Sequence, residues 1–546
     1  MNKDITLVDT QEQHAVVGFP TKPPANHRRV DTGFSPFWYD RLIEGALILS
    51  MALYYMVSNP NIHVGHFSLT SSVFHCPLSS LPFLLIFAVL CWYRLPFAVA
   101  LLPLSLPYYL QQKQVVSHYE FSLVEITLAT CVLVALLQIL VQRQRWPYWS
   151  SLTQLRSRLG PFIVPVLLFL FIAAFSILIA FRHDFALRAF REEVFDPLVY
   201  VLLALTCLRT RQDVTRLLGA LLGTGLIIAG LGLVQMVFFR NTLKLEDGVR
   251  RIYAVYGSAN SIGLLFDYVL PIGFAMLLAR VSLRLRLIAL LCCLPMLVVL
   301  YLTQSLGAWV AIALALLFVI AFAVRNRKLL LIGSSILVVM LLAGTFLFRA
   351  QITNLVTGHH TSVGGKGIHT VSTVTKRIYL WESALDMIHD SPWVGYGMDN
   401  WLCHYSDNPI CDAHYHYWIE RDPVTHKDTG LKYEPTLSHP HNIFLHVWVS
   451  TGVFGLLAFI AILVLFFWLF SRIIRRLDAN AYKGSEHLRW LTVGVGAAMF
   501  AALVQGQVDS AFLEQDLSFC FWILVTALLL VRVHSETAWR GKTYLP

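Results

Sequence analysis

The chain has 546 residues, of which 57% are hydrophobic and 14% charged, with a mean hydropathy of +0.63 and a formal net charge of +10. A chain of this length and composition is too apolar to be a protein with one soluble core. The positive charge does not indicate a nucleic-acid partner, because no basic patch with interleaved aromatic residues forms a soluble face.

Apolar windows of membrane-spanning length follow one another along the chain. A helix needs about 20 apolar residues to cross a hydrocarbon layer roughly 30 Å thick. The windows are continuously apolar rather than alternating, which favours helices over a closed β-barrel. We therefore predict an all-α, polytopic membrane protein of about 12–14 transmembrane helices, in which a short or proline-flanked pair could be re-entrant. The windows lie near residues 42–58, 78–93, 95–110, 121–142, 160–180, 194–208, 215–238, 258–279, 285–303, 307–324, 328–348, 441–470, 488–508 and 517–533.

The distribution of Lys and Arg predicts the orientation. With the N-terminus inside, most of the 42 basic residues fall in alternate loops on the inner side, which is the positive-inside pattern. The chemistry is then expected on the outer face. The predicted parts are a cytoplasmic N-terminal tail (1–40), a first set of transmembrane helices (41–348), one large external loop domain (349–440), a last set of transmembrane helices (441–533) and a cytoplasmic tail (534–546).

A group of basic residues violates this charge bias on the predicted outer side. Charge at the rim of a membrane domain is costly, and the planar fork of arginine suits phosphate oxygens. One interpretation is a site for an anionic lipid headgroup or a diphosphate, and the other is pairing with nearby acids or ordinary anionic lipids. The basic residues are Arg182, Arg188, Arg191, Arg240, Lys244, Arg250, Arg251, Lys376 and Arg377. The nearby acids are Asp184, Glu192, Glu193, Asp196 and Asp247.

Short motifs follow one another on the same predicted side. Arg251 opens the run RIYAVYGSAN, which leads into the window near 258–279. Arg377 opens the run RIYLWESAL, with SPWVGYG shortly after it, and His441 lies in the run HPHNIFL at the start of the next window. In this order, across a long outer loop flanked by many helices, the sequence resembles the O-antigen ligase and polymerase superfamily over roughly residues 250–470.

The resemblance implies a membrane-embedded, GT-C-like glycosyltransferase of the bacterial cytoplasmic membrane, with its active site facing the periplasm or exterior. Such enzymes take a polyprenyl-diphosphate-linked glycan as donor and transfer it to a hydroxyl of a lipid- or glycan-linked acceptor, without a cofactor or a metal. His441 then stands at the position of the family's essential histidine, and Arg377 and Arg251 at the positions of two motif arginines. One departure is Leu306, which stands where family members commonly have an arginine.

The chemistry of such a transfer supports these roles independently. Displacing a diphosphate from an anomeric carbon develops negative charge on the leaving group and requires removal of a proton from the incoming hydroxyl. A neutral imidazole suits the second task near pH 7, and fixed guanidinium groups suit the first. We therefore predict an inverting transfer with His441 as general base. The predicted diphosphate ligands are Arg377, Arg251, Arg250, Arg188 and Arg191.

Other residues of the motifs have structural interpretations. Trp381, Asn442 and Gly397 are expected to hold the loop in shape, since Asn442 can cap its helix and Gly397 can take a positive φ. A histidine at a helix start is itself commonly a cap. Glu382 and Asp399 are therefore kept as alternative bases.

A metal site and a disulfide are further hypotheses for the loop. Its histidines are dense, but no Cys/His array has standard zinc spacing, so we expect no metal. Cys403 and Cys411 lie in the same predicted external loop, where an oxidising environment could join them. The histidines are His404, His414, His416, His426, His439 and His441.

Two alternative functions stay open. A small-anion transporter would also explain external cationic residues, although transporters usually bind their substrates near the bilayer midplane. Within the transferase interpretation, a ligase and a polymerase would share the base and the diphosphate site and differ in the acceptor. The loop motifs favour the ligase, while the sugar, the acceptor and the oligomeric state are not predicted.

Overall fold

The computed structural model describes residues 36–543, apart from internal gaps, and residues 46–546 form one compact unit. The gaps are 59–60, 65–66, 71–79, 110–111, 117–118, 247–248, 280, all but single residues of 324–358, 364–365, 371–372, 406–414, 416–418, 422–427, 433–438 and 480–484.

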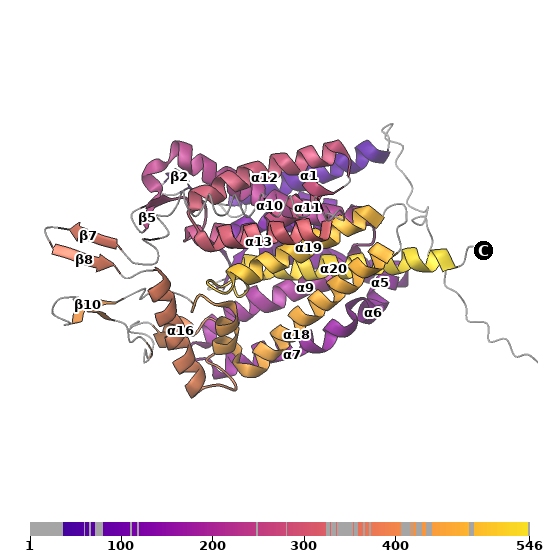
Figure 1. The fold of residues 1–546 in the computed structure, drawn as a ribbon. Helices are drawn as coiled ribbons and strands as arrows, with labels where there is room; N and C mark the ends of the chain where they lie inside the picture. The colour runs from indigo at the N-terminus through magenta and orange to yellow at the C-terminus, as the bar shows by residue number, and fades with distance from the viewer. Residues whose placement is uncertain are drawn as a thin grey trace, which may run out of the picture. The chain divides into compact units, whose positions relative to one another are not determined.

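Every predicted window in the described part of the chain contains a helix (Figure 1), and the window near 328–348 lies outside that part. Among the described residues, 8 helices are long and apolar enough to cross a membrane, and three apolar helices are shorter. The predicted all-helical, multi-pass fold is confirmed. The helices are α1 (Pro36–Ser58), α2 (Leu81–Tyr93), α3 (Leu95–Leu101), α4 (Leu123–Gln142), α5 (Trp149–Thr153), α6 (Leu155–Leu159), α7 (Ile163–Ile179), α8 (His183–Ala189), α9 (Asp196–Cys207), α10 (Arg211–Phe238), α11 (Ala259–Leu278), α12 (Leu283–Thr303), α13 (Leu306–Ala323), α16 (Thr373–Asp390), α17 (Trp401–Tyr405), α18 (Ile443–Ala479), α19 (Ser485–Gln505) and α20 (Gln515–Thr543).

The short helix in the window near 95–110 is explained by its prolines. After α3 the chain continues as a 3-10 helix, Leu102–Tyr108, which contains Pro103 and Pro107. Proline has no N–H to donate, so it leaves carbonyl groups without their helical partners. The hydroxyl of Thr224 in α10 donates to the carbonyl of Pro103 at 2.6 Å, which satisfies one of these groups inside the bundle.

Three helices form the centre of the bundle. The apolar windows of α11, α19 and α20 are each 83% buried inside the protein, whereas those of α7 and α12 are 28% buried and leave wide apolar faces for lipid. Small residues let the central helices approach closely: a side chain at Gly263 would collide with Ala308, and one at Gly494 would crowd Ile272. Close contact between small residues is a common way to pack helices in membranes.

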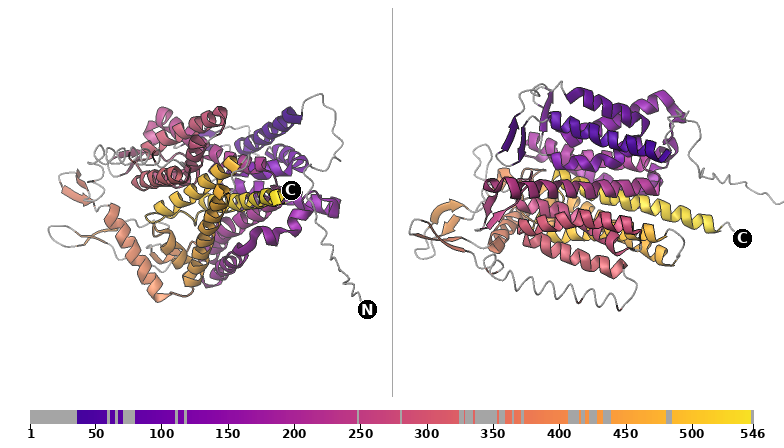
Figure 2. Two further views of the ribbon diagram at one scale, coloured as in Figure 1. Left: turned by 45° about the vertical axis from the view of Figure 1, so that its right-hand side comes forward. Right: turned by 90° about the horizontal axis from the view of Figure 1, so that it is seen from above.

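The strands in the described residues form only two-stranded antiparallel hairpins. The hairpins between residues 359 and 432 and helix α16 gather at one end of the bundle, which we call the loop end, and the C-terminal part of helix α20 lies at the other (Figures 1 and 2). The pairs are β1 (Asn61–Val64) with β2 (Phe67–Thr70), β3 (Gln112–Val116) with β4 (Tyr119–Ser122), β5 (Lys244–Glu246) with β6 (Val249–Arg251), β7 (His359–Val363) with β8 (Lys366–Thr370), and β9 (Ile419–Arg421) with β10 (Asp428–Lys432).

The loop end is anchored where α18 is interrupted at Gly452, whose φ is 70°. The freed carbonyls of Val449 and Ser450 accept the N–H groups of Tyr396 and Gly397 at 2.8 and 3.1 Å. Gly397 has a φ of 93° and lies so close to Ala180 that no side chain fits there. The segment between α16 and α17 is therefore fixed onto α18 by backbone hydrogen bonds that only an interrupted helix can offer.

A small hydrophobic core continues from this anchor. Leu380 and Met387 of α16 pack with Trp401 of α17 and Val449 of α18. Cys403, also in α17, is disulfide-bonded. Cys411, its expected partner, lies outside the described residues, so that pairing stays a prediction.

Candidate active site

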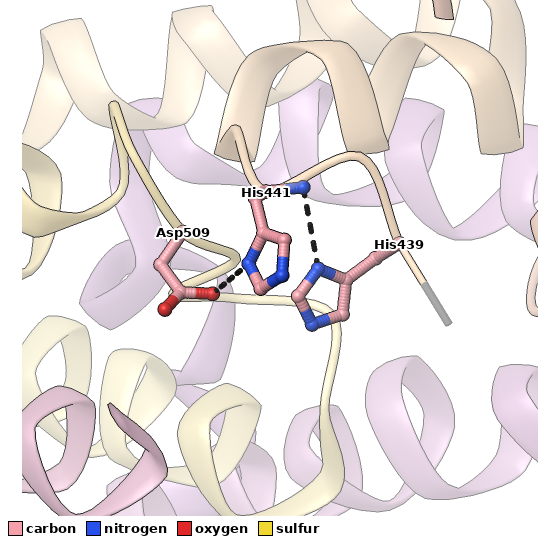
Figure 3. A group of neighbouring side chains, drawn as sticks. All are labelled: His439, His441 and Asp509. Carbon is pink, nitrogen blue, oxygen red and sulfur yellow. Dashed lines mark hydrogen bonds and ion pairs between the residues drawn. The ribbon is translucent and has the colours of Figure 1, made fainter. Parts of the chain in front are cut away.

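Segments that are distant in the sequence meet at the loop end: α16, the start of α18, and the connection 506–514 between α19 and α20. The N–H of Ile443 donates to the carbonyl of Gly506 at 2.7 Å, and the indole of Trp381 donates to the carbonyl of His441 at 3.4 Å. Figure 3 shows the imidazole of His441 between Asp509 and His439 at this junction. The junction brings together Arg377 of α16, His441 before α18 and Asp509 of the 506–514 connection.

His441 itself has an unusual backbone. Its φ is 51°, a left-handed conformation that costs on the order of 1–3 kcal/mol for a residue other than glycine. The next residue, Asn442, caps α18: its Oδ1 accepts the N–H groups of Phe444 and Leu445 at 3.0 and 3.1 Å. Its Nδ2 donates to the carbonyl of Gln507 at 3.0 Å. The cap is therefore Asn442, and the side chain of His441 is left to face the 506–514 connection.

Asp509 is the partner of that side chain. Its Oδ1 lies 2.6 Å from Nδ1 of His441, and both side chains are largely buried, with exposed fractions of 6% and 12%. The sequence motifs did not identify Asp509. Its only sequence signal is a carboxylate in a short connection between two apolar windows, where a charge is costly to keep.

The hydrogen bond between His441 and Asp509 decides where the imidazole carries its proton. An ionised carboxylate only accepts hydrogen bonds, so Nδ1 of His441 donates. In the neutral ring, Nε2 then has a free lone pair. This arrangement leaves Nε2 able to take a proton from a hydroxyl group, while the carboxylate stabilises the imidazolium that forms.

Arg377 lies on the other side of the same carboxylate. Its Nη2 is 4.0 Å from Oδ2 of Asp509, and its side chain is 16% exposed. Arg377 and Trp381 lie one turn apart on α16, so both can reach the start of α18 from the same helix face. A partly buried guanidinium thus lies next to the histidine–carboxylate pair, as a site for an anionic leaving group requires.

A second histidine–carboxylate pair adjoins the first. Nδ1 of His439 accepts the backbone N–H of His441 at 3.3 Å, and its Nε2 lies 3.5 Å from Oε1 of Glu514. The two imidazole rings lie edge to face, with centroids 4.5 Å apart. His446, one turn into α18, bonds to the hydroxyl of Ser510 at 2.6 Å.

Arg251 and Arg250 lie at the end of strand β6, and neighbouring strand residues point to opposite faces. Arg251 is buried and Arg250 is exposed. The chain after Arg251 is fixed at Tyr256, whose hydroxyl donates to Oδ2 of Asp516 at 2.9 Å. Asp516 lies in the first turn of α20, so the Arg251 segment is attached to the helix that directly follows the 506–514 connection.

The remaining predicted arginines lie in ion pairs. Arg188 pairs with Asp399 at 3.0 Å, and Arg191 pairs with Glu125 at 2.6 Å and with Glu192 at 2.9 Å. Burial raises the pKa of the Asp399 carboxyl, although Arg188 opposes the shift. Burial and the neighbouring Glu125 raise the pKa of Glu192 to about 7. These contacts agree with the interpretation that these basic residues pair with nearby acids.

Arg182 is paired as well. Its guanidinium donates to Asp184 at 2.9 and 2.7 Å, and this hydrogen bonding lowers the pKa of Asp184 to about 2. Of the acids predicted to pair with the basic residues, Asp184 and Glu192 thus form ion pairs. Glu125 and Asp399 were not predicted as partners, because they are distant in the sequence from the arginines that contact them.

Replacing Arg191 with glutamine is expected to destabilise the protein far more than replacing Arg188. Glu125 is 5% exposed, and removing the cation of a buried pair costs about 3–5 kcal/mol. The Arg188–Asp399 pair is half-exposed, and such pairs contribute about 0–1 kcal/mol. Thermal unfolding of the detergent-purified variants, followed by tryptophan fluorescence, measures the difference. Equal midpoints for both variants would contradict the assigned pairing.

A group of three side chains could hold a metal ion. One ligand atom from each of His439, His441 and Asp509 lies within 4.8 Å of the others. The Nδ1 atoms of both histidines already have hydrogen-bond partners, which a metal ion at those atoms would have to displace. His404 packs between Phe181 and Tyr396, and His414, His416 and His426 lie outside the described residues.

Leu306 begins α13 and is 37% exposed. The preceding Gln304 has a left-handed backbone with a φ of 53°. Position 306 is therefore a partly accessible helix N-terminus, and an arginine there would be partly accessible as well. Leu306 itself brings no charge to the loop end.

The fold and these side chains define a class: a multi-pass membrane protein with a partly buried histidine, carboxylate and arginine at one end of its helical bundle. Residues 291–460 match the model of the O-antigen ligase family, so this part of the chain is similar to that family. The match includes Arg377 and His441, whereas Arg251, Asp509 and Glu514 lie outside it. Comparison with curated proteins gives no match. The predicted resemblance to this family is confirmed over residues 291–460.

Proposed function

We propose that the protein is an inverting glycosyltransferase that moves a glycan from a polyprenyl-diphosphate carrier to a hydroxyl of a lipid- or glycan-linked acceptor. The observation that carries the proposal is the contact of Asp509 with both His441 and Arg377, within and beside the region that matches the O-antigen ligase family. A base for the acceptor and a cation for the leaving group are thus held within one small region.

Each group has one task in the reaction. The acceptor hydroxyl gives its proton to Nε2 of His441 as its oxygen bonds to the anomeric carbon. The bond from that carbon to the diphosphate oxygen breaks, and the electron pair leaves on the diphosphate, next to Arg377 and Arg251. Attack opposite the leaving group inverts the anomeric centre. His441 then releases the proton to solvent and returns to its neutral form.

The site is proposed to face the exterior of the cytoplasmic membrane. Arg158, Arg209 and Arg532 gather at the end of the bundle opposite the loop end, where they donate to Leu205, to Ser151, and to Ser157 and Arg158. The positive-inside rule favours the cytoplasm for such an end. In this orientation the donor binds to the loop end, at the outer surface of the membrane.

Reconstituted transfer tests the proposal. The purified protein is placed in vesicles with a polyprenyl-diphosphate glycan and candidate acceptors, with and without EDTA. We expect release of polyprenyl diphosphate and a newly attached glycan, equally in both conditions. A ladder of growing products would identify a polymerase and a single attachment a ligase. Loss of activity with EDTA that added metal restores would contradict metal independence, and glycan or anion flux without a new bond would favour a transporter.

Replacing Arg377 with alanine is expected to lower kcat/KM about 10²-fold or more, and lysine should restore only part of it. Lysine keeps the charge but loses the planar fork that contacts two phosphate oxygens. Steady-state kinetics with varied donor measure both effects. Arg182→Gln is the matched control, because it removes a partly exposed cation that is paired with Asp184. An equal loss in the control would show that the general charge of this end matters, and not Arg377.

A further inference from the structure

The histidine two residues before His441 is not used by the proposed reaction, yet it is buried and has a partner on each ring nitrogen. Its Nδ1 accepts the backbone N–H of His441, and a nitrogen that accepts carries no hydrogen. The hydrogen of its neutral ring is therefore on Nε2, which faces Glu514. The contacts of His439 thus specify one tautomer.

The N–H that His439 accepts belongs to a strained residue. His441 has a φ of 51°, and strained backbone at functional sites persists only when the surrounding structure determines it. On its other side, the carbonyl of His441 accepts the indole N–H of Trp381 at 3.4 Å. The peptide groups on both sides of the strained Cα are therefore held by side chains from outside the α18 helix.

Glu514 faces His439 from the 506–514 connection, with its Oε1 3.5 Å from Nε2 of the ring. It lies in the same 506–514 segment as Asp509, which fixes the imidazole of His441. The carbonyl of Glu514 accepts the N–H of Ser518 at 2.8 Å in the first turn of α20, so the position of the acid is set by that helix. One connection therefore orients both the backbone and the side chain of His441.

Resting on the proposed function, we infer that His439 and Glu514 are positioning residues, which hold His441 in its left-handed conformation so that Nε2 reaches the acceptor hydroxyl. His439 acts through its Nδ1 lone pair, and Glu514 acts by keeping the ring hydrogen on Nε2. Neither residue transfers a proton. A misplacement of about 1 Å of a reacting group lowers a rate by about 10²-fold, which sets the expected size of the effect.

Matched variants separate this role from proton transfer. His439→Asn keeps an acceptor at the place of Nδ1, because its Oδ1 is attached at the same branch of the side chain, and should retain most of the turnover. His439→Gln and His439→Ala remove that acceptor and should lower kcat about 10²-fold with the KM for the donor unchanged. Glu514→Gln keeps an acceptor for the Nε2 hydrogen and should stay close to wild type, whereas Glu514→Ala should not.

A double-mutant cycle supplies a readout that a general structural defect would not give. If His439 acts only through His441, then adding His439→Ala to His441→Ala should not reduce the residual rate further. Thermal unfolding of each purified variant identifies those that fail to fold, and His439→Asn keeps the test valid if His439→Ala is one of them.

The outcomes separate the two proposals. Equal activity of His439→Asn and His439→Ala, additive losses in the cycle, or inactivity of Glu514→Gln would each overturn the positioning role while leaving the transferase intact. Near-normal transfer by His441→Ala alone would instead overturn the general base, and with it the proposed function on which the inference rests.

Discussion

Transfer by the His441→Ala protein is expected to fall by about 10²–10⁴-fold, the range that general base catalysis contributes. Asp509 engages Nδ1 of the His441 imidazole, so the lone pair on Nε2 is available to accept the proton. Donor binding should be unchanged, since the phosphate contacts are assigned to arginines. The measurement is single-turnover transfer in vesicles, together with binding of the labelled donor.

Glu382→Gln is the matched control for this prediction. Glu382 is an exposed carboxylate on α16, next to Trp381, and is one of the alternative bases. We expect its replacement to change the rate little. Normal transfer by His441→Ala with loss in Glu382→Gln would reassign the base to the carboxylate, and loss of donor binding in His441→Ala would show that the histidine binds the substrate instead.

Asp509→Asn is expected to have the second-largest effect, a loss on the order of 10²–10⁴-fold in kcat with little change in the KM for the donor. In serine hydrolases, replacing the buried aspartate that orients the catalytic histidine with asparagine has an effect of this size. The asparagine amide permits the wrong histidine tautomer and no longer stabilises the imidazolium. Here the same change also removes the negative charge that lies 4.0 Å from Arg377. Steady-state kinetics with donor and acceptor varied in turn measure the effect.

Asp399→Asn tests whether any carboxylate of the loop end would give the same loss. Asp399 is partly buried and paired with Arg188, and we expect its replacement to leave kcat nearly unchanged. The losses from Asp509→Asn and His441→Ala should also fail to add when the two changes are combined, because both act on one group. Additive losses would mean that Asp509 acts separately from His441.

The two largest expected effects concern residues that differ in how they could be found. His441 lies in a motif of consecutive residues, which resembles a family pattern and can be read without the fold. Asp509 is 68 residues further along and stands in a connection with no motif of its own. It was recognised only because the α19–α20 connection packs against the start of α18.

The fold class needed only the sequence. Apolar windows predict helices because every backbone polar group inside a bilayer must be paired within its own segment, and this requirement acts locally. The same holds for the cap at Asn442, which depends on the first turn of one helix. The window near 95–110 was also recognised, although its prolines divide it into an α-helix and a 3-10 helix.

The partners of the charged side chains were decided by the tertiary structure. Arg191 meets Glu125 of α4 as well as its sequence neighbour Glu192, and Arg188 meets Asp399 from 211 positions away. The second pair at the site, His439 with Glu514, likewise joins two segments that only helix packing brings together. An apolar window predicts that a segment spans the membrane, but it does not predict which segment lies beside it. The sequence by itself therefore determined a helical membrane protein with a histidine and arginine motif, and only the packing of α16, α18 and the 506–514 connection decided which carboxylates complete the site.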